Sequence, residues 1–131
     1  MVVAALRSPS GASAALLRRV RAGDVVSVAS VALALEYEAV CKRPEHQIAS
    51  GLTRPEVSLF VDAVIAMMEP MKSHYLWRPQ LRDPNDEMVL EAAINGRASI
   101  LATFNVKDFL PAKRFGIEVL RPHDALRRLV Q

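Results

Sequence analysis

The chain has 131 residues, 51% of them hydrophobic and 24% charged, which suits one domain with a buried core and excludes a disordered protein and a coiled coil. Its single cysteine, Cys41, excludes a disulfide framework and indicates a reducing compartment, and the net charge of +3 favours an anionic partner such as nucleic acid. No apolar stretch is long enough for a membrane span or a signal peptide, so we expect a soluble cytoplasmic protein.

The first part of the chain alternates between helix and strand signals. Residues 13–22 predict a helix, and Gly23 stands where a helix commonly ends. Residues 25–28 form a short β-branched run that predicts a buried strand. Ser30 can cap a further helix, which Pro44 prevents from continuing.

The middle of the chain contains the clearest helix signal. Thr53 and Glu56 have the spacing of a capping box, and residues 57–68 repeat apolar side chains with the period of one helix face. A short strand over residues 71–73 and a loop over residues 74–81 are expected to follow.

The last part continues the alternation. The expected elements are a helix from Asp83 to Asn95 closed by Gly96, a strand over residues 99–103, a loop or short helix over residues 104–111, a strand over residues 117–120 and a helix over residues 123–130. Strands separated by helices predict a single α/β domain, residues 1–131, with a mostly parallel sheet. In such sheets the functional groups gather at the carboxyl ends of the strands.

One carboxylate in the predicted helix after Ser30 has no evident partner. Glu38 precedes Lys42 by four residues, which predicts an ordinary surface ion pair. Glu36 instead has Ala32 and Val40 as helical neighbours and no basic residue in reach along the helix. A carboxylate on an apolar stripe is normally paired, bound to a metal or at the edge of the stripe, so Glu36 is a candidate site residue.

Two aspartates stand at the start of the predicted helix from Asp83 to Asn95. Asp83 suits a helix cap and Asp86 the first helical turn, yet Asp86 also has apolar neighbours one turn later. Glu87 and Glu91 are expected on the outer, solvated side of the same helix.

Asn105 and Asp108 come directly after the predicted strand over residues 99–103, where a turn would also use such residues. If the fold brings these groups and Glu36 to one edge of the sheet, their oxygen atoms suit Mg²⁺ or Mn²⁺. With an anionic substrate, the chemistry to expect is phosphodiester hydrolysis.

Five segments resemble the PIN domain family, in the branch of toxin components of bacterial toxin–antitoxin pairs. They are residues 5–13 (ALRSPSGAS), 35–38 (LEYE), 77–86 (WRPQLRDPND), 89–93 (VLEAA) and 103–109 (TFNVKDF). The resemblance covers nearly the whole chain, and the last two segments at this separation are fairly specific. It implies an α/β three-layer sandwich around a mostly parallel sheet.

The resemblance also implies an activity, a site and partners. The activity is a metal-dependent endoribonuclease that uses Mg²⁺ or Mn²⁺ to cleave single-stranded RNA, and the partners are a cognate antitoxin protein and a second copy in a homodimer. The implied catalytic and metal-binding residues are Glu36, Asp86 and Asp108, with Asn105 as a further ligand, Asp83 beside the ligands or the substrate, and Thr103 orienting the loop.

The chain departs from the family pattern at its start. PIN domains begin with a strand that ends in Asp-Thr-Asn, and residues 1–6 align just after that motif, so we expect the first strand to be missing. Two explanations remain open, a displaced start codon and a truncated form. In the truncated form, residues 2–6 could be recruited as a strand, or the exposed sheet could pair with another copy.

Two other functions remain as alternatives. The first is a catalytically inactive PIN-like module that binds RNA or a protein partner. The second is a phospho-receiver domain, which needs paired acidic groups after its first strand and an aspartate after its third. The sequence offers neither of these at a convincing place, so the phospho-receiver ranks below the other two.

Overall fold

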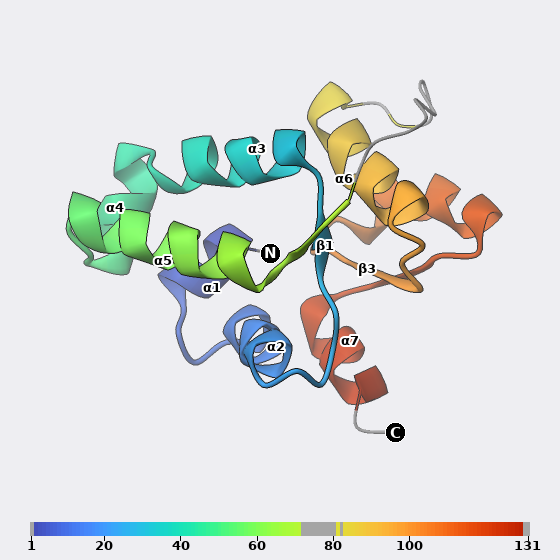
Figure 1. Ribbon diagram of the computed structural model, residues 1–131, viewed down its shortest axis with the longest axis horizontal. Coiled ribbons are helices and arrows are strands. Elements are labelled where there is room, and N and C mark those ends of the chain that lie inside the picture. Colours follow the sequence, from blue (N-terminus) through green and yellow to red (C-terminus); the bar gives the residue numbers. More distant parts are fainter. Residues whose placement is uncertain (1, 72–80, 82, 130–131) are drawn as a thin grey trace.

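The structure is a computed structural model that describes residues 2–71, 81 and 83–129. Its elements in chain order are α1 (Val2–Arg7), α2 (Ala12–Arg21), β1 (Val28–Ala29), α3 (Val31–Cys41), α4 (Pro44–Ser50), α5 (Arg54–Met67), β2 (Glu69–Pro70), α6 (Pro84–Asn95), β3 (Ile100–Ala102), the 3₁₀ helix η1 (Val106–Phe115), β4 (Glu118–Leu120) and α7 (Pro122–Leu129) (Figure 1). Within the described residues, none of the helices has the length and apolar character required to traverse a lipid bilayer.

Several helix ends follow from local signals in the sequence. Gly23 adopts a φ of +84° just after α2, as its position predicted. The Ser30 hydroxyl accepts a hydrogen bond from the Leu33 amide at 3.1 Å and so caps α3. At α5 the Glu56 amide donates to the Thr53 hydroxyl at 3.3 Å, and the Thr53 amide donates to the Glu56 carboxylate at 2.9 Å, which completes the predicted capping box.

Two helices near the start differ from the expectations. Val2–Arg7 forms the helix α1 and not a strand, because Val2, Ala5 and Leu6 lie on one helical face and are buried there. The helix α4 was not predicted. Pro44, taken as the end of the preceding helix, is also the first residue of α4, a position where proline loses no hydrogen bond.

The strands are shorter than predicted, and all their pairings are parallel. β1 pairs with β2, β3 pairs with β4, and within the described residues these remain two separate two-stranded sheets. The parallel arrangement therefore agrees with the prediction, whereas one continuous central sheet is not found. Val26, in the run predicted as a buried strand, is 69% exposed, and only Val28 of that run joins β1. Residues 72–80, which include part of the predicted strand over 71–73 and most of the predicted loop, lie outside the described part.

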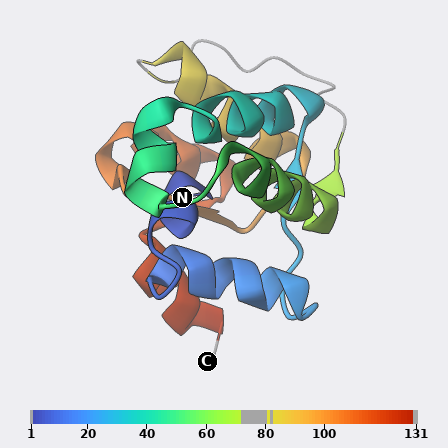
Figure 2. The same ribbon diagram turned by 90° about the vertical axis from the view of Figure 1, so that its left-hand side faces the viewer.

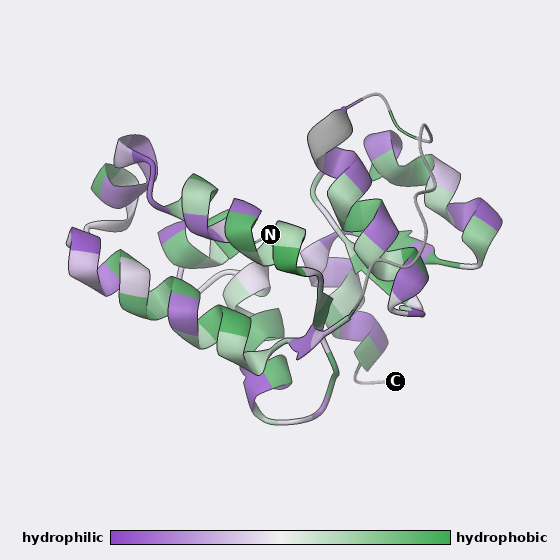
Figure 3. Cartoon of the chain, turned by 45° about the horizontal axis from the view of Figure 1, so that its top comes forward, coloured by the Kyte–Doolittle hydropathy of each residue, from purple (hydrophilic) through white to green (hydrophobic). Residues whose placement is uncertain are grey.

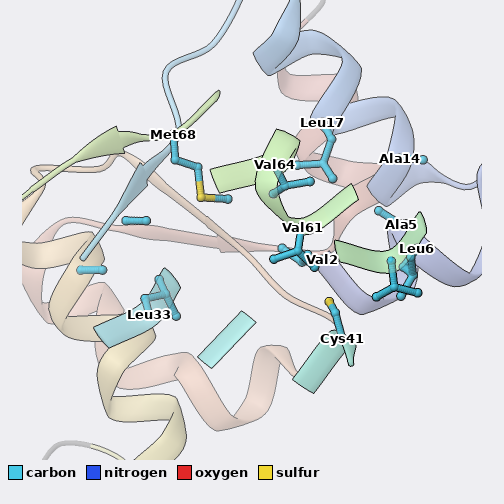
Figure 4. Close-up of a cluster of buried hydrophobic side chains, with 13 residues drawn as sticks. Val2, Ala5, Leu6, Ala14, Leu17, Leu33, Cys41, Val61, Val64 and Met68 are labelled. Carbon is cyan, nitrogen blue, oxygen red and sulfur yellow. The ribbon is translucent and has the colours of Figure 1, made fainter. Parts of the chain in front are cut away.

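The core is divided into two clusters that meet at α6. The first contains buried residues of α1, α2, α3 and α5, several of which are labelled in Figure 4. The second contains residues of α6, β3, η1 and β4, with Leu90 fully buried at its centre. Val89 packs against both clusters. Figure 3 shows polar and apolar residues alternating along most helices, the pattern of helices with one face in a core.

The helix α1 lies within the first cluster. It packs against α2 on one side and against α3 and α4 on the other, as the turned view shows (Figure 2). Cys41, at the end of α3, is 0% exposed, which agrees with its interpretation as a small buried residue.

The end of α6 is adapted to a close neighbour. A Cβ atom at Gly96 would lie 2.8 Å from Cγ2 of Val28, so glycine at this position lets β1 approach the helix. The left-handed residue is the next one, Arg97, with a φ of +54°. The Arg97 amide donates to the Ile94 carbonyl at 3.1 Å and the Ala98 amide to the Ala93 carbonyl at 2.9 Å, which are the two bonds of a Schellman motif.

Candidate metal and nuclease site

The beginning of α6 and the beginning of η1 line one cavity of about 550 Å³. Its lining consists of Leu81, Asp83, Asp86, Lys107, Asp108, Leu110 and Pro111. The helix α6 packs against η1 and β3, so its first turn meets the segment that leaves the carboxyl end of β3. The fold therefore brings together Asp83, Asp86 and Asp108, which the sequence analysis proposed from two separate segments.

Asp86 is the partly buried carboxylate of this cavity. Partial burial raises the pKa of Asp86 above its ordinary value, and the negative charges of Asp83, Asp108 and Glu87 raise it further. Asp83 and Asp108 are exposed, whereas Asp86 is only partly exposed. Asp83 and Asp108 are thus close enough to oppose the ionisation of Asp86, and a cation in the cavity would relieve that repulsion.

The loop after β3 is held by a chain of three hydrogen bonds, two between backbone groups and one to the Thr103 hydroxyl. The Thr103 amide donates to the Leu120 carbonyl at 2.8 Å, which extends the pairing of β3 with β4 by one residue. The Thr103 hydroxyl is buried and accepts from the Asn105 amide at 3.0 Å. The Asp108 amide then donates to the Asn105 carbonyl at 3.0 Å. These bonds fix the backbone that carries Asn105 and Asp108.

Glu36 is not among the residues that line this cavity. It is half-buried on α3, and within the described ranges its side chain makes no hydrogen bond or ion pair. It is not among the charges that raise the pKa of Asp86. Glu38, by contrast, pairs with Lys42 at 2.9 Å, as the spacing predicted. The structure brings Asp83, Asp86 and Asp108 together, and the role of Glu36 stays a prediction.

The donor chemistry of the cavity fits a hard divalent cation. In the part of the chain that is described, no three histidine, cysteine, aspartate or glutamate side chains are close enough to form a metal cage. Mg²⁺ does not require such a cage, because it usually retains several waters and binds one or two carboxylates together with substrate phosphates. Asp86 and Asp108 are the residues that could hold it in this way, with Asp83 beside them.

The prediction for Glu87 and Glu91 was wrong. Each is only 3% exposed, although both were expected on a solvated face. The reason is that α6 is covered on more than one side, by α3, β1, β3 and η1, which the apolar period of its own sequence does not reveal. One oxygen of Glu87 accepts the Leu81 amide at 2.8 Å, so this carboxylate also helps to fix the segment that leads into α6.

Sequence reasoning also missed Lys107, a cation in the lining of an otherwise acidic cavity. Its position between Asn105 and Asp108 was the signal that could have indicated it.

Comparison with known proteins gives one result. The family model of the PIN domain matches residues 1–107. No curated protein and no solved structure matches the chain. The matched region includes the strand β3, the first turn of α6 and the start of η1, and therefore most of the cavity lining. Since it covers well over half of the sequence, the chain belongs to the PIN domain family.

Proposed function

We propose that this protein is a metal-dependent endoribonuclease of the toxin type, which hydrolyses phosphodiester bonds of single-stranded RNA. PIN domains are generally nucleases, and PIN nucleases generally use divalent metal ions. The observation that carries the proposal for this chain is the convergence of Asp83, Asp86 and Asp108 on one cavity, with Asp86 under the influence of the other two charges.

In this proposal the cavity residues have separate tasks. Mg²⁺ or Mn²⁺, held by Asp86 and Asp108 with Asn105 and Glu36 as further proposed ligands, would supply an activated water and neutralise charge at phosphorus. Thr103 positions Asn105 through the hydrogen bond between its hydroxyl and the Asn105 amide.

Asp83 directly precedes α6 and lines the same cavity as Asp86, and its proposed place is beside the ligands or the substrate.

The proposed partners are an antitoxin protein and a second copy of the chain, in the cytoplasm, where the single buried thiol of Cys41 stays reduced. A second cavity, of about 650 Å³, supports a protein partner. It is mostly apolar, lies between α1, α2 and α5, and has Arg18 and Arg21 among its lining residues. An apolar groove next to arginines suits a helix with acidic side chains.

The alternative is an inactive PIN module that binds RNA or a protein. In residues 2–71, 81 and 83–129 no three-ligand cluster is found. Calorimetric titration with Mn²⁺ separates the two functions. Heat of binding that Asp86→Asn abolishes supports the nuclease, and its absence in the unchanged protein supports the inactive module.

The decisive test is RNA cleavage with and without Mg²⁺ or Mn²⁺. We expect Asp86→Asn to lower the rate of RNA cleavage by about 10- to 100-fold or more. That range is typical of residues that support a metal site. Asp62→Asn is the matched control, since Asp62 is exposed on α5 and outside the cavity. Equal cleavage by the Asp86→Asn protein would assign the activity to a contaminant and refute the proposal.

A further inference from the structure

An exposed aromatic ring stands next to the candidate site. Phe104 is 50% exposed and lies between the buried Thr103 and Asn105. It is outside the lining of the carboxylate cavity, and it precedes Lys107, which is part of that lining, by three residues. Three residues span at most about 11 Å, a distance that a short piece of single-stranded backbone covers.

The backbone on both sides of Phe104 is fixed. The Thr103 amide and hydroxyl are both engaged, at 2.8 Å with the Leu120 carbonyl and at 3.0 Å with the Asn105 amide. The Asn105 carbonyl accepts the Asp108 amide at 3.0 Å. A ring presented from a fixed backbone loses little conformational entropy on binding, which is the property of a preorganised stacking surface.

Lys107 supplies a cation in the cavity itself. Over the described ranges the side chain of Lys107 makes no hydrogen bond or ion pair, although Asp83, Asp86 and Asp108 line the same cavity. Its ammonium group is therefore available to an anion that enters the cavity. Lys113, on the same 3₁₀ helix, is also exposed but lies outside the lining, and it provides a matched comparison.

We propose that Phe104 and Lys107 form a nucleotide-binding subsite, in which the ring of Phe104 stacks on an unpaired base and Lys107 binds a phosphate next to the carboxylates. The subsite rests on the proposed function and explains why the substrate is single-stranded, since a base in a duplex has no free face for the ring. Stacking is tolerant of sequence because every base has an aromatic face, so the subsite contributes affinity and registers the strand without selecting one base.

Binding of a fluorescently labelled single-stranded RNA to the full chain carrying Asp86→Asn, followed by anisotropy, tests the ring. With Phe104→Ala we expect the affinity to fall about 5- to 150-fold, the range for loss of one stacked base. Phe104→Trp retains the affinity, whereas Phe104→Leu loses it as alanine does. Leu59→Ala, at an exposed position of α5, is the control and leaves the affinity unchanged. Equal affinity for the leucine and tryptophan variants overturns the stacking role.

The salt dependence of the same binding tests the cation. Lys107→Met should reduce the slope of log affinity against log salt by about 0.7, the value for one phosphate contact on a single strand. Lys113→Met should leave the slope unchanged, and equal effects of the two variants overturn a specific contact at Lys107. Circular dichroism of each variant shows that the fold is retained.

Failure of the subsite and failure of the nuclease are distinguishable. If the unchanged protein cleaves RNA with a divalent ion and Phe104→Ala binds as tightly as the parent, the subsite is wrong and the nuclease stands. If binding follows the predicted pattern and no divalent ion supports cleavage, the subsite stands and the inactive module is the correct function. If the unchanged protein neither binds nor cleaves RNA, both proposals are wrong.

Discussion

Asp86 is held where its own negative charge is unfavourable. Burial and the charges of Asp83, Asp108 and Glu87 all raise its pKa, so the carboxyl binds its proton more tightly in the folded protein than in the unfolded chain. The raised pKa does not affect stability at low pH, where the carboxyl is protonated in both the folded and the unfolded chain. It destabilises the folded protein as the pH rises above 3.8, the ordinary pKa of an aspartate, because the unfolded chain then ionises more readily. The ionised carboxylate that the proposed metal site needs therefore lowers the stability of the metal-free fold.

We predict that Asp86→Asn raises the melting temperature at pH 7 in the presence of a chelator. At pH 3 the gain should vanish, because the carboxyl is then protonated in both the folded and the unfolded chain. Thermal denaturation at the two pH values measures this difference. Addition of Mn²⁺ should stabilise the parent protein more than the variant, and a lower melting temperature of the variant at pH 7 would contradict the electrostatic account.

Arg97 has a backbone conformation that suits glycine. A φ of +54° costs a residue with a side chain about 1 kcal/mol or more. The glycine of this turn, Gly96, stands one position earlier and does not relieve that cost. We predict that Arg97→Gly increases the free energy of unfolding by about 1 kcal/mol, measured by urea denaturation. Arg97→Ala retains the strain and is the control. A gain of equal size for alanine would show that loss of the arginine side chain is responsible.

At the scale of elements, the helix α5 depends on a cap that the sequence made visible. We predict that Thr53→Ala lowers the free energy of unfolding by about 0.5–2 kcal/mol at pH 7, because the Glu56 amide loses its acceptor. Chemical denaturation measures the loss. Ser58→Ala, further along the same helix, is a comparison that leaves the cap intact.

Glu56 adds a pH dependence to this cap. Hydrogen bonds from Thr53 lower the pKa of Glu56, so its stabilising contribution is present above the ordinary value of 4.5 and is lost as the pH falls through the lower, folded value. Glu56→Gln is therefore expected to lower the melting temperature at pH 7 and to have no such effect at pH 3. An equal loss at both pH values would assign the effect to packing.

Local sequence signals predicted the ends of helices well where a residue has a single common role at a helix end. Ser30, Thr53 and Gly23 each marked a helix end correctly. Pro44 was also correct as a barrier, since α3 ends at Cys41, but its second use as the first residue of α4 was not predicted. In the site, Asp86 and Asp108 were expected to meet and do line one cavity, although the strands form two separate sheets and not the one expected edge. Glu87 was placed in solvent because no local pattern reveals what packs on the other faces of α6.

At the scale of the molecule, the two core clusters are connected through α6. The separation of the strands into two pairs could not be predicted, because pairing between distant strands leaves no trace in local periodicity. One of the contacts between the two clusters joins the end of α6 to β1, where Gly96 meets Val28.

This contact gives a prediction for the whole fold. In Gly96→Ala the new Cβ would lie 2.7 Å from the Ala92 carbonyl and 2.8 Å from Cγ2 of Val28, so β1 and α6 must separate. We predict a loss of about 1–3 kcal/mol in the free energy of unfolding, as for other overpacked sites. Combining it with Val28→Ala should give a smaller loss than the sum of the single changes. Strict additivity would show that the two residues do not meet.

Cys41 carries the one thiol of the chain and is entirely covered in the first cluster, where burial also raises its pKa. Only the thiolate attacks disulfide reagents, and only an opened core exposes it. The rate at which such a reagent labels the native protein therefore reports how often the layer formed by α1, α3 and α5 opens. The chain carries its own probe of core opening, which needs no engineered label.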